Sequence, residues 1–101
     1  MEKRCRLRVP EDVRELIRHL HPDLKQKLRA VLDSLLRAPG QGKALRDELR
    51  GLRSVRLGRM RLIYRETGEV IELVTFGPRR SIYEDTLRLL VREKNGGGEN
   101  D

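Results

Sequence analysis

The chain has 101 residues, enough for a single domain with one modest core. It carries 23 Lys and Arg against 16 Asp and Glu, and this formal charge of +7 favours a polyanionic partner such as a phosphate backbone or an acidic protein. A single cysteine, Cys5, excludes an internal disulfide and indicates a reducing compartment, and one Cys with two clustered His does not give metal-ligand spacing. We therefore expect neither a metal nor a cofactor.

Two further exclusions concern targeting. No apolar run approaches the roughly 18 residues that a membrane helix needs, and the first residues lack the apolar core of a signal peptide. We expect a cytoplasmic protein that does not enter a membrane.

The first part of the chain predicts one strand and two helices. Residues 4–9 alternate charged and apolar side chains, as in a short half-buried strand. Pro10 precedes a helix with apolar residues at 3.6-residue spacing, which ends near His21. A second helix runs from about Asp23 and stops before Ala38. The two helices are expected to form an antiparallel hairpin.

The second part predicts three strands and a short helix. Residues 40–51 form a polar connector with a helical turn around Ala44 to Leu49, and the tight turns are Gly58-Arg59 and Thr67-Gly68. The strands are expected near Leu52–Leu57, Met60–Glu66 and Glu69–Phe76, and the helix at Glu84–Lys94. Residues 1–94 would be one domain, and residues 95–101 a disordered tail.

The order β-α-α-β-β-β-α predicts an α+β fold, in which the helices pack on one face of a small, mainly antiparallel sheet. If Gly58-Arg59 is a type II′ turn, Arg56 lies directly opposite Arg61, and Leu57 lies opposite Met60 on the other face. Like charges directly opposite each other destabilise a sheet by up to about 1 kcal/mol. A bound polyanion would relieve this repulsion, so the pattern predicts an anion site.

Two motifs resemble those of a known family. The segment LRGLRSVRLGRMRLIY, Leu49–Tyr64, resembles the leucine-glycine-leucine and R-x-G-x-Y-R-[LV]-[IV]-Y hairpin of the RelE/ParE toxin superfamily. The segment GPRRSIY, Gly77–Tyr83, resembles its terminal G-H-R-x-x-[VI]-Y motif. The chain is thus similar to toxins of type II toxin–antitoxin systems, and closest to the RelE-like mRNA interferases.

This resemblance implies a ribosome-dependent endoribonuclease that cleaves mRNA in the A site, by attack of a ribose 2′-hydroxyl on its neighbouring phosphate. Arg61 matches the hairpin arginine that stabilises charge on the phosphate, and Arg56 matches a basic residue on the preceding strand. Arg79 matches the arginine after the glycine, and Tyr83 the tyrosine that stacks on or orients a base. The basic residues expected to contact RNA beside them are Arg53, Arg59, Arg80 and Lys43.

Some residues depart from the family pattern. Ser54 stands where some members have lysine, and Pro78 where others have histidine, so no obvious general base is present. Glu72 would lie on the arginine face if the Thr67-Gly68 register holds, and Glu48 is another candidate. The alternatives are a gyrase inhibitor of the ParE type and an inactive relative that binds only RNA or an antitoxin.

A second alternative concerns the arginines themselves, which could pair with Glu72, Glu66 or acids of a partner instead of with RNA. The resemblance also implies a cognate antitoxin, which would neutralise the basic face and bury apolar surface under the last helix or along the helical hairpin. We expect a monomeric toxin that forms a hetero-oligomer with its antitoxin.

Overall fold

A mixed five-stranded sheet forms the centre of the computed structural model. The structure describes residues 5–94 in full and the backbone of residues 95–99. The strand order is β1-β5-β4-β3-β2, and only the pairing of β1 with β5 is parallel. The elements are β1 (Arg6–Arg8), α1 (Glu11–Arg18), α2 (Pro22–Arg37), β2 (Lys43–Ala44), β3 (Leu52–Leu57), β4 (Met60–Thr67), β5 (Val70–Pro78) and α3 (Ile82–Glu99). The predicted α+β class and the order of the larger elements are confirmed.

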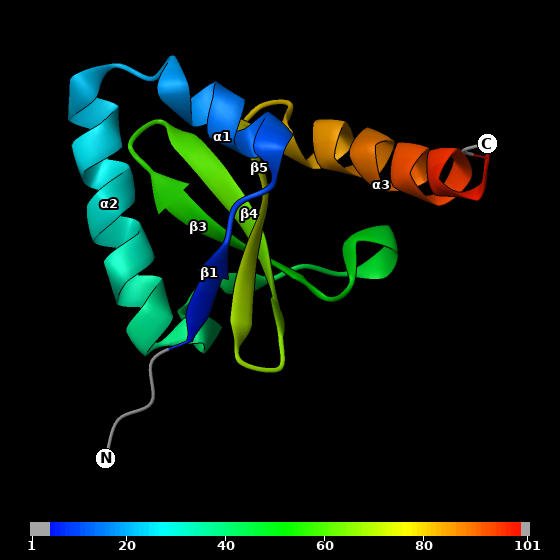
Figure 1. Cartoon of the computed structure of the whole chain (residues 1–101), viewed down its shortest axis with the longest axis horizontal. Helices are drawn as coiled ribbons and strands as arrows, with labels where there is room; N and C mark the ends of the chain where they lie inside the picture. Colours follow the sequence, from blue (N-terminus) through cyan, green and yellow to red (C-terminus); the bar gives the residue numbers. More distant parts are fainter. Residues whose placement is uncertain (1–4, 100–101) are drawn as a thin grey trace.

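The helical hairpin forms as its start signals indicate. Pro10 precedes α1, whose first turn carries two acids, and Pro22 occupies the first turn of α2. His21 caps α2, because its Nδ1 accepts a hydrogen bond from the backbone N–H of Asp23 at 3.1 Å. In Figure 1, α2 runs along one side of the sheet and α3 extends away from it on the other side.

Helices cover both faces of the sheet, which corrects the expectation that they pack on one face. The hairpin face holds the main core of Val13, Leu28, Leu35, Leu57, Leu62, Tyr64, Ile71 and Leu73. The α3 face holds a smaller cluster of Leu52, Ile63 and Ile82. The physical reason lies in β4, where the neighbours Leu62 and Ile63 point to opposite faces and are both 0% exposed.

The connector contains a short strand that the polar sequence did not indicate. Lys43–Ala44 pairs with β3 as β2, and the expected helical turn is reduced to Asp47–Leu49. Tyr64 holds this segment in place, because its buried hydroxyl donates to the Pro39 carbonyl at 2.7 Å and accepts the Gly42 N–H at 3.0 Å. The strand thus depends on a contact with a distant residue.

The two tight turns have different outcomes. Gly58-Arg59 is the first turn, and its predicted register, with Leu57 opposite Met60, is confirmed. The second turn is Gly68-Glu69 and not Thr67-Gly68, since Thr67 pairs with Val70. Both turns place glycine first with a positive φ, +63° at Gly58 and +62° at Gly68, as a type II′ turn requires.

The last helix is longer than predicted. It begins at Ile82 rather than Glu84, and its backbone continues to Glu99. The predicted tail covers residues 95–101. The structure describes only the backbone of residues 95–99, and residues 100 and 101 lie outside the described part of the chain, so the domain boundary stays a prediction. No helix in the described part of the chain is long and apolar enough to cross a membrane.

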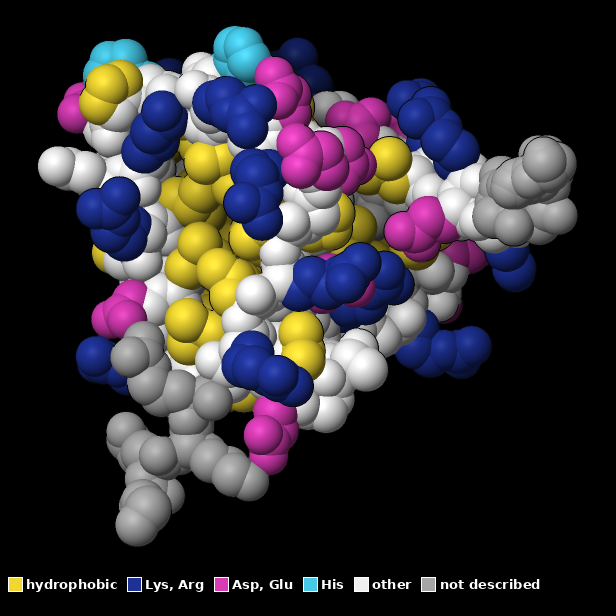
Figure 2. All heavy atoms as spheres, viewed as in Figure 1, with side chains coloured by type: hydrophobic (Ala, Val, Ile, Leu, Met, Phe, Trp, Pro, Cys, Tyr) yellow, Lys and Arg dark blue, Asp and Glu magenta, His cyan; other side chains and the backbone are white. Residues whose placement is uncertain are grey.

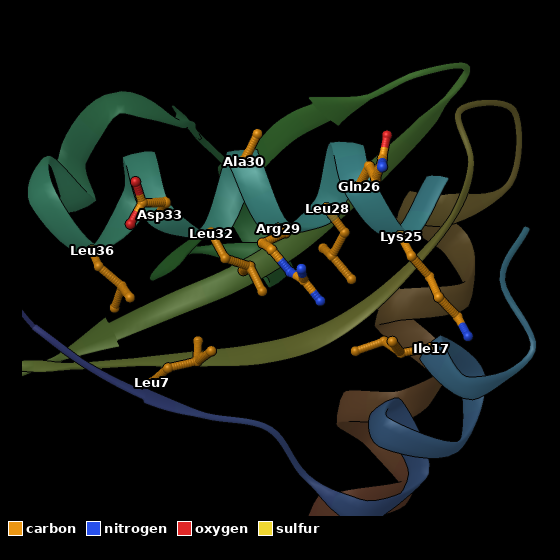
Figure 3. Close-up of a pocket in the computed structure, with 10 residues that line it drawn as sticks. All are labelled: Leu7, Ile17, Lys25, Gln26, Leu28, Arg29, Ala30, Leu32, Asp33 and Leu36. Carbon is orange, nitrogen blue, oxygen red and sulfur yellow. The ribbon is translucent and has the colours of Figure 1, made fainter. Parts of the chain in front are cut away.

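An apolar groove of about 740 Å³ lies between α2, α1 and β1, and we call it the α2 groove. Figure 2 shows apolar side chains gathered there with lysine and arginine around them. Its apolar lining comes from Leu7, Ile17, Leu28, Leu32 and Leu36. In Figure 3 the three α2 leucines point toward Leu7 and Ile17, with Lys25 and Arg29 beside them. This surface adjoins the open edge of the sheet at β1, where Leu7 is 38% exposed.

Candidate nucleic-acid interface

The predicted arginine pair forms on the α3 face of the sheet. Arg56 on β3 lies directly opposite Arg61 on β4, and Arg61 lies opposite Gly77 on β5. Arg56 is exposed and Arg61 is partly buried. Gly77 presents no side chain to Arg61, and a Cβ at this position would lie 3.3 Å from Ile82 Cδ1. The guanidinium of Arg61 therefore has a second cation on one side and a bare backbone on the other.

No carboxylate among the described residues pairs with Arg56, Arg61 or Arg79. Glu72, which was expected on the arginine face, lies opposite Arg65 and accepts hydrogen bonds from Arg65 at 2.8 Å and Arg8 at 2.9 Å. Glu72 therefore does not pair with Arg56, Arg61 or Arg79, as one alternative suggested. The charge of the Arg56–Arg61 pair remains open to an external anion.

Glu72 is also poorly suited to act as a general base. Burial alone would raise the pKa of its carboxyl, but the hydrogen bonds from Arg65 and Arg8 outweigh burial and lower the pKa. A carboxylate with a lowered pKa binds a proton weakly, and both of its oxygens are already engaged by guanidinium groups. The second candidate, Glu48, is exposed on the Asp47–Leu49 turn.

Ser54 lies between Arg61 and Tyr83. From the sequence it was noted only as a position where some family members have lysine. It is 1% exposed, and its Oγ lies 3.4 Å from Arg61 Nη1 and 3.4 Å from the hydroxyl of Tyr83. These distances are at the long end for hydrogen bonds. The signal was available in β3, because strand alternation places Ser54 on the same face as Arg56. We call Arg56, Arg61, Ser54 and Tyr83 the sheet site.

Tyr83 is brought to the sheet by the first turn of α3. Its ring packs against the cluster of Leu52, Ile63 and Ile82, and its hydroxyl reaches Ser54. The ring is only partly buried, so part of it remains accessible. Tyr83 therefore covers part of the sheet, and its hydroxyl lies beside Ser54, which also contacts Arg61.

The remaining predicted residues lie at different places in the fold. Arg79 and Arg80 are exposed in the turn between β5 and α3, and Arg59 is exposed at the tip of the β3–β4 hairpin. Lys43 is exposed on β2, directly opposite Ser54. Arg53 is not brought to the site, because it lies opposite Tyr64 on the hairpin face. Its guanidinium donates to the Gly42 carbonyl at 2.8 Å and so supports the connector.

The sequence and the fold agree on the class of protein. A family model described as the ParE toxin of type II toxin-antitoxin systems, parDE, matches residues 6–83. This match covers more than half of the chain, so the chain belongs to the ParE toxin family. The expected membership of the RelE/ParE superfamily is confirmed.

Solved structures of RelE toxins are similar in fold. The toxin-antitoxin complex RelBE2 from Mycobacterium tuberculosis matches at 27% identity and a TM-score of 0.69, over 76% of this chain and 100% of that chain. A free mutant of Escherichia coli RelE matches at 18% identity and a TM-score of 0.73, over 90% and 98%. The archaeal RelE-RelB complex from Pyrococcus horikoshii matches at 22% identity and a TM-score of 0.64, over 76% and 97%. No curated protein sequence matches the chain.

Proposed function

We propose that this toxin is a ribosome-dependent endoribonuclease that cleaves mRNA in the A site and so stops translation. The observation that carries the proposal is the sheet site, where two opposed arginines, without carboxylate partners among the described residues, adjoin a tyrosine. The likeness in fold to RelE toxins supports it. Inhibition of translation would follow from loss of the message.

The proposed reaction is an internal phosphoryl transfer. The ribose 2′-oxygen forms a bond to the adjacent phosphorus while the bond from phosphorus to the 5′-oxygen breaks, and the proton lost by the 2′-hydroxyl is balanced by one gained at the 5′-oxygen. Arg61 would hold the nonbridging oxygens, because a guanidinium matches a phosphate with two parallel donors. Tyr83 would present its accessible ring to an unpaired base, a contact worth about 1–3 kcal/mol.

The general base is assigned outside the toxin. Glu72 is held by Arg8 and Arg65, and no carboxylate of the described residues pairs with the arginines of the sheet site. An arginine remains protonated and cannot accept the proton. We assign the base to ribosomal RNA, which gives a chemical reason for dependence on the ribosome.

The proposed partner is a cognate antitoxin that occupies the α2 groove. Two of the similar structures are toxin-antitoxin complexes, RelBE2 and the archaeal RelE-RelB. The groove offers an apolar floor with Lys25 and Arg29 beside it, which fits the apolar face of an amphipathic helix whose flanks carry acidic residues (Figure 3). The free toxin would be a monomer and the complex a hetero-oligomer.

A ParE-like gyrase inhibitor is the second candidate, and the family model that matches the chain favours it. No carboxylate of residues 5–94 pairs with the arginines of the sheet site, which is consistent with a binding role. In this case the arginines would contact a protein or DNA surface without cleaving it.

The two candidates are separated by parallel assays on one preparation. The purified toxin is added to a reconstituted translation reaction, the 5′ ends of the mRNA are mapped by primer extension, and supercoiling by gyrase is measured at the same toxin concentrations. Arg61→Ala removes the central cation, and Arg14→Ala removes an exposed cation from α1 as the matched control. Cuts at A-site codons that require ribosomes, persist with Arg14→Ala and disappear with Arg61→Ala would support the endonuclease. Intact mRNA with inhibited supercoiling would refute it in favour of the gyrase inhibitor.

A further inference from the structure

The short strand β2 brings an additional cation to the arginine face. In the β2–β3 ladder Lys43 pairs with Ser54 and Ala44 with Arg53. Residues directly opposite each other in an antiparallel pair project to the same face, with Cβ atoms about 4.5–5.5 Å apart. Lys43 therefore leaves the sheet on the same side as Ser54, whose hydroxyl contacts Arg61 and Tyr83.

The charge of Lys43 is available to a ligand. The residue is exposed, and no carboxylate of the described residues forms an ion pair with it. Three cations, Lys43, Arg56 and Arg61, are thus grouped around the buried Ser54 from three neighbouring strands. Such a grouping without internal acids favours an anion with several oxygens.

The backbone on both sides of Lys43 is anchored, which distinguishes it from a mobile surface lysine. On one side, the N–H of the adjacent Gly42 donates to the Tyr64 hydroxyl at 3.0 Å, and its carbonyl accepts from Arg53 at 2.8 Å. A Cβ on Gly42 would lie 2.5 Å from the Tyr64 hydroxyl, so the approach is close enough to require glycine. On the other side, the Leu45 N–H donates to the Leu52 carbonyl at 3.0 Å.

We propose that Lys43 is a third cation of the sheet site, which binds the reacting phosphate together with Arg61, and that Tyr64 is a positioning residue that fixes its register. This inference rests on the proposed function and specifies how the site holds its substrate. As charge builds on the nonbridging oxygens during attack of the 2′-oxygen, the Lys43 ammonium stabilises it and keeps its own proton. Tyr64 acts only through Gly42 and the start of β2.

The first test is single-turnover cleavage on programmed ribosomes at saturating toxin, with the full chain. Lys43→Ala is expected to lower the cleavage rate by about 100-fold to 1,000-fold, and Lys43→Arg to keep most of it because the charge remains. Arg14→Ala, which removes an exposed cation from α1 outside the α2 groove, is the control and should leave the rate unchanged. A wild-type rate for Lys43→Ala would overturn the inference while leaving the proposed function intact.

A double-mutant cycle tests the positioning role. Tyr64→Phe should slow cleavage, and this effect should disappear in the Lys43→Ala background, since both changes then act through one cation. A merely structural loss would slow cleavage equally in both backgrounds and would refute the positioning role.

A binding measurement keeps the inference testable if the wild-type toxin does not cleave. An uncleavable single-stranded RNA, in which each 2′-hydroxyl is methylated, is titrated at several salt concentrations and followed by fluorescence anisotropy. Removing one phosphate contact lowers the slope of log K against log salt by about 0.7. This change with Lys43→Ala, and none with Arg14→Ala, would support the phosphate contact even if the proposed cleavage fails. If the wild-type toxin does not cleave, an unchanged slope with Lys43→Ala would overturn the inference.

Discussion

Replacing Tyr64 by phenylalanine removes a single oxygen atom from the centre of the hairpin face, where the tyrosine is 0% exposed. The change leaves the ring in place and breaks two hydrogen bonds, to the Pro39 carbonyl and from the Gly42 N–H. Pro39 is only partly buried, so water can reach its carbonyl, whereas Gly42 is buried and its N–H loses its partner. A buried unsatisfied donor costs about 1–3 kcal/mol. We therefore expect the free energy of unfolding to fall by this amount.

The assay is thermal unfolding followed by circular dichroism, with urea titration as a second measure. One kcal/mol shifts Tm by about 4–8 °C in a domain of this size, so a decrease of roughly 5–20 °C is expected. Tyr83→Phe is the matched control, because its hydroxyl contact with Ser54 is long, at 3.4 Å, and its loss should change stability by no more than about 0.5 kcal/mol. A Tm for Tyr64→Phe within about 2 °C of the wild type would refute the reasoning.

The pH dependence of the same variant adds an independent check. Burial raises the pKa of Tyr64 above 10.0, and the hydrogen bond from Gly42 only partly opposes this effect. The folded pKa is therefore above the unfolded pKa, so the contribution of neutral Tyr64 is complete below pH 10.0 and is lost as the pH rises through the raised pKa. Tyr64→Phe should lack this alkaline loss, and the stability difference between the two proteins should narrow in alkaline buffer.

Two further variants test the ion-pair network and the first turn. Glu72→Gln should lower the free energy of unfolding by about 1–3 kcal/mol at pH 7, because it weakens charge-assisted hydrogen bonds to Arg8 and Arg65. The pKa of Glu72 in the folded protein lies below 4.5, so its contribution to stability is complete above pH 4.5 and is lost as the pH falls through the lowered pKa. The free energies of unfolding of the variant and the wild type, measured by urea titration, should therefore converge in acid. A difference that persists in acid would contradict this explanation. Gly58→Ala should cost more than about 1 kcal/mol, because φ is +63° and the new Cβ would lie 3.2 Å from a side chain of α2. Gly40→Ala, with no neighbour within 4 Å, should change the urea midpoint little, and an equal effect of both substitutions would count against the turn argument.

The sequence predicts features that depend on local chemistry. Proline and acid signals locate the two helices, and a leading glycine fixes the register that places Arg56 opposite Arg61. The same rule identifies Gly68-Glu69 as the second turn, since Gly68 also comes first there with a positive φ. The predicted turn, Thr67-Gly68, was displaced by one residue. It would have paired Glu72 with Ile63, whereas Glu72 pairs with Arg65 in the structure. The arginine face was nevertheless predicted correctly, because the shift along β4 was by an even number of residues.

Features that depend on distant contacts were not predictable in the same way. β2 has two residues and no apolar pattern. The residue before it, Gly42, is held by a hydrogen bond to Tyr64, which lies 22 residues further along the chain. The position of α3 on the second face depends on the burial of Ile63 beneath it, which a run of apolar residues in β4 does not distinguish from a one-sided strand. The sequence identifies Ser54 only as a position where some family members have lysine. Its contacts with Arg61 and Tyr83 become visible only in the folded structure.

The parallel pairing of β1 with β5 has a consequence for how the protein is made. The contact of Arg8 with Glu72 joins residues 64 positions apart, so the first strand cannot pair until β5 has left the exit tunnel of the ribosome that synthesises it. The β3–β4 hairpin with its opposed arginines joins residues close in the chain and can form earlier, while Tyr83 follows both. Until β5 emerges, the nascent toxin therefore has no partner for β1 or for the outer edge of β4, and its site is incomplete. The order of synthesis delays assembly of the sheet site until the sheet that supports it is complete.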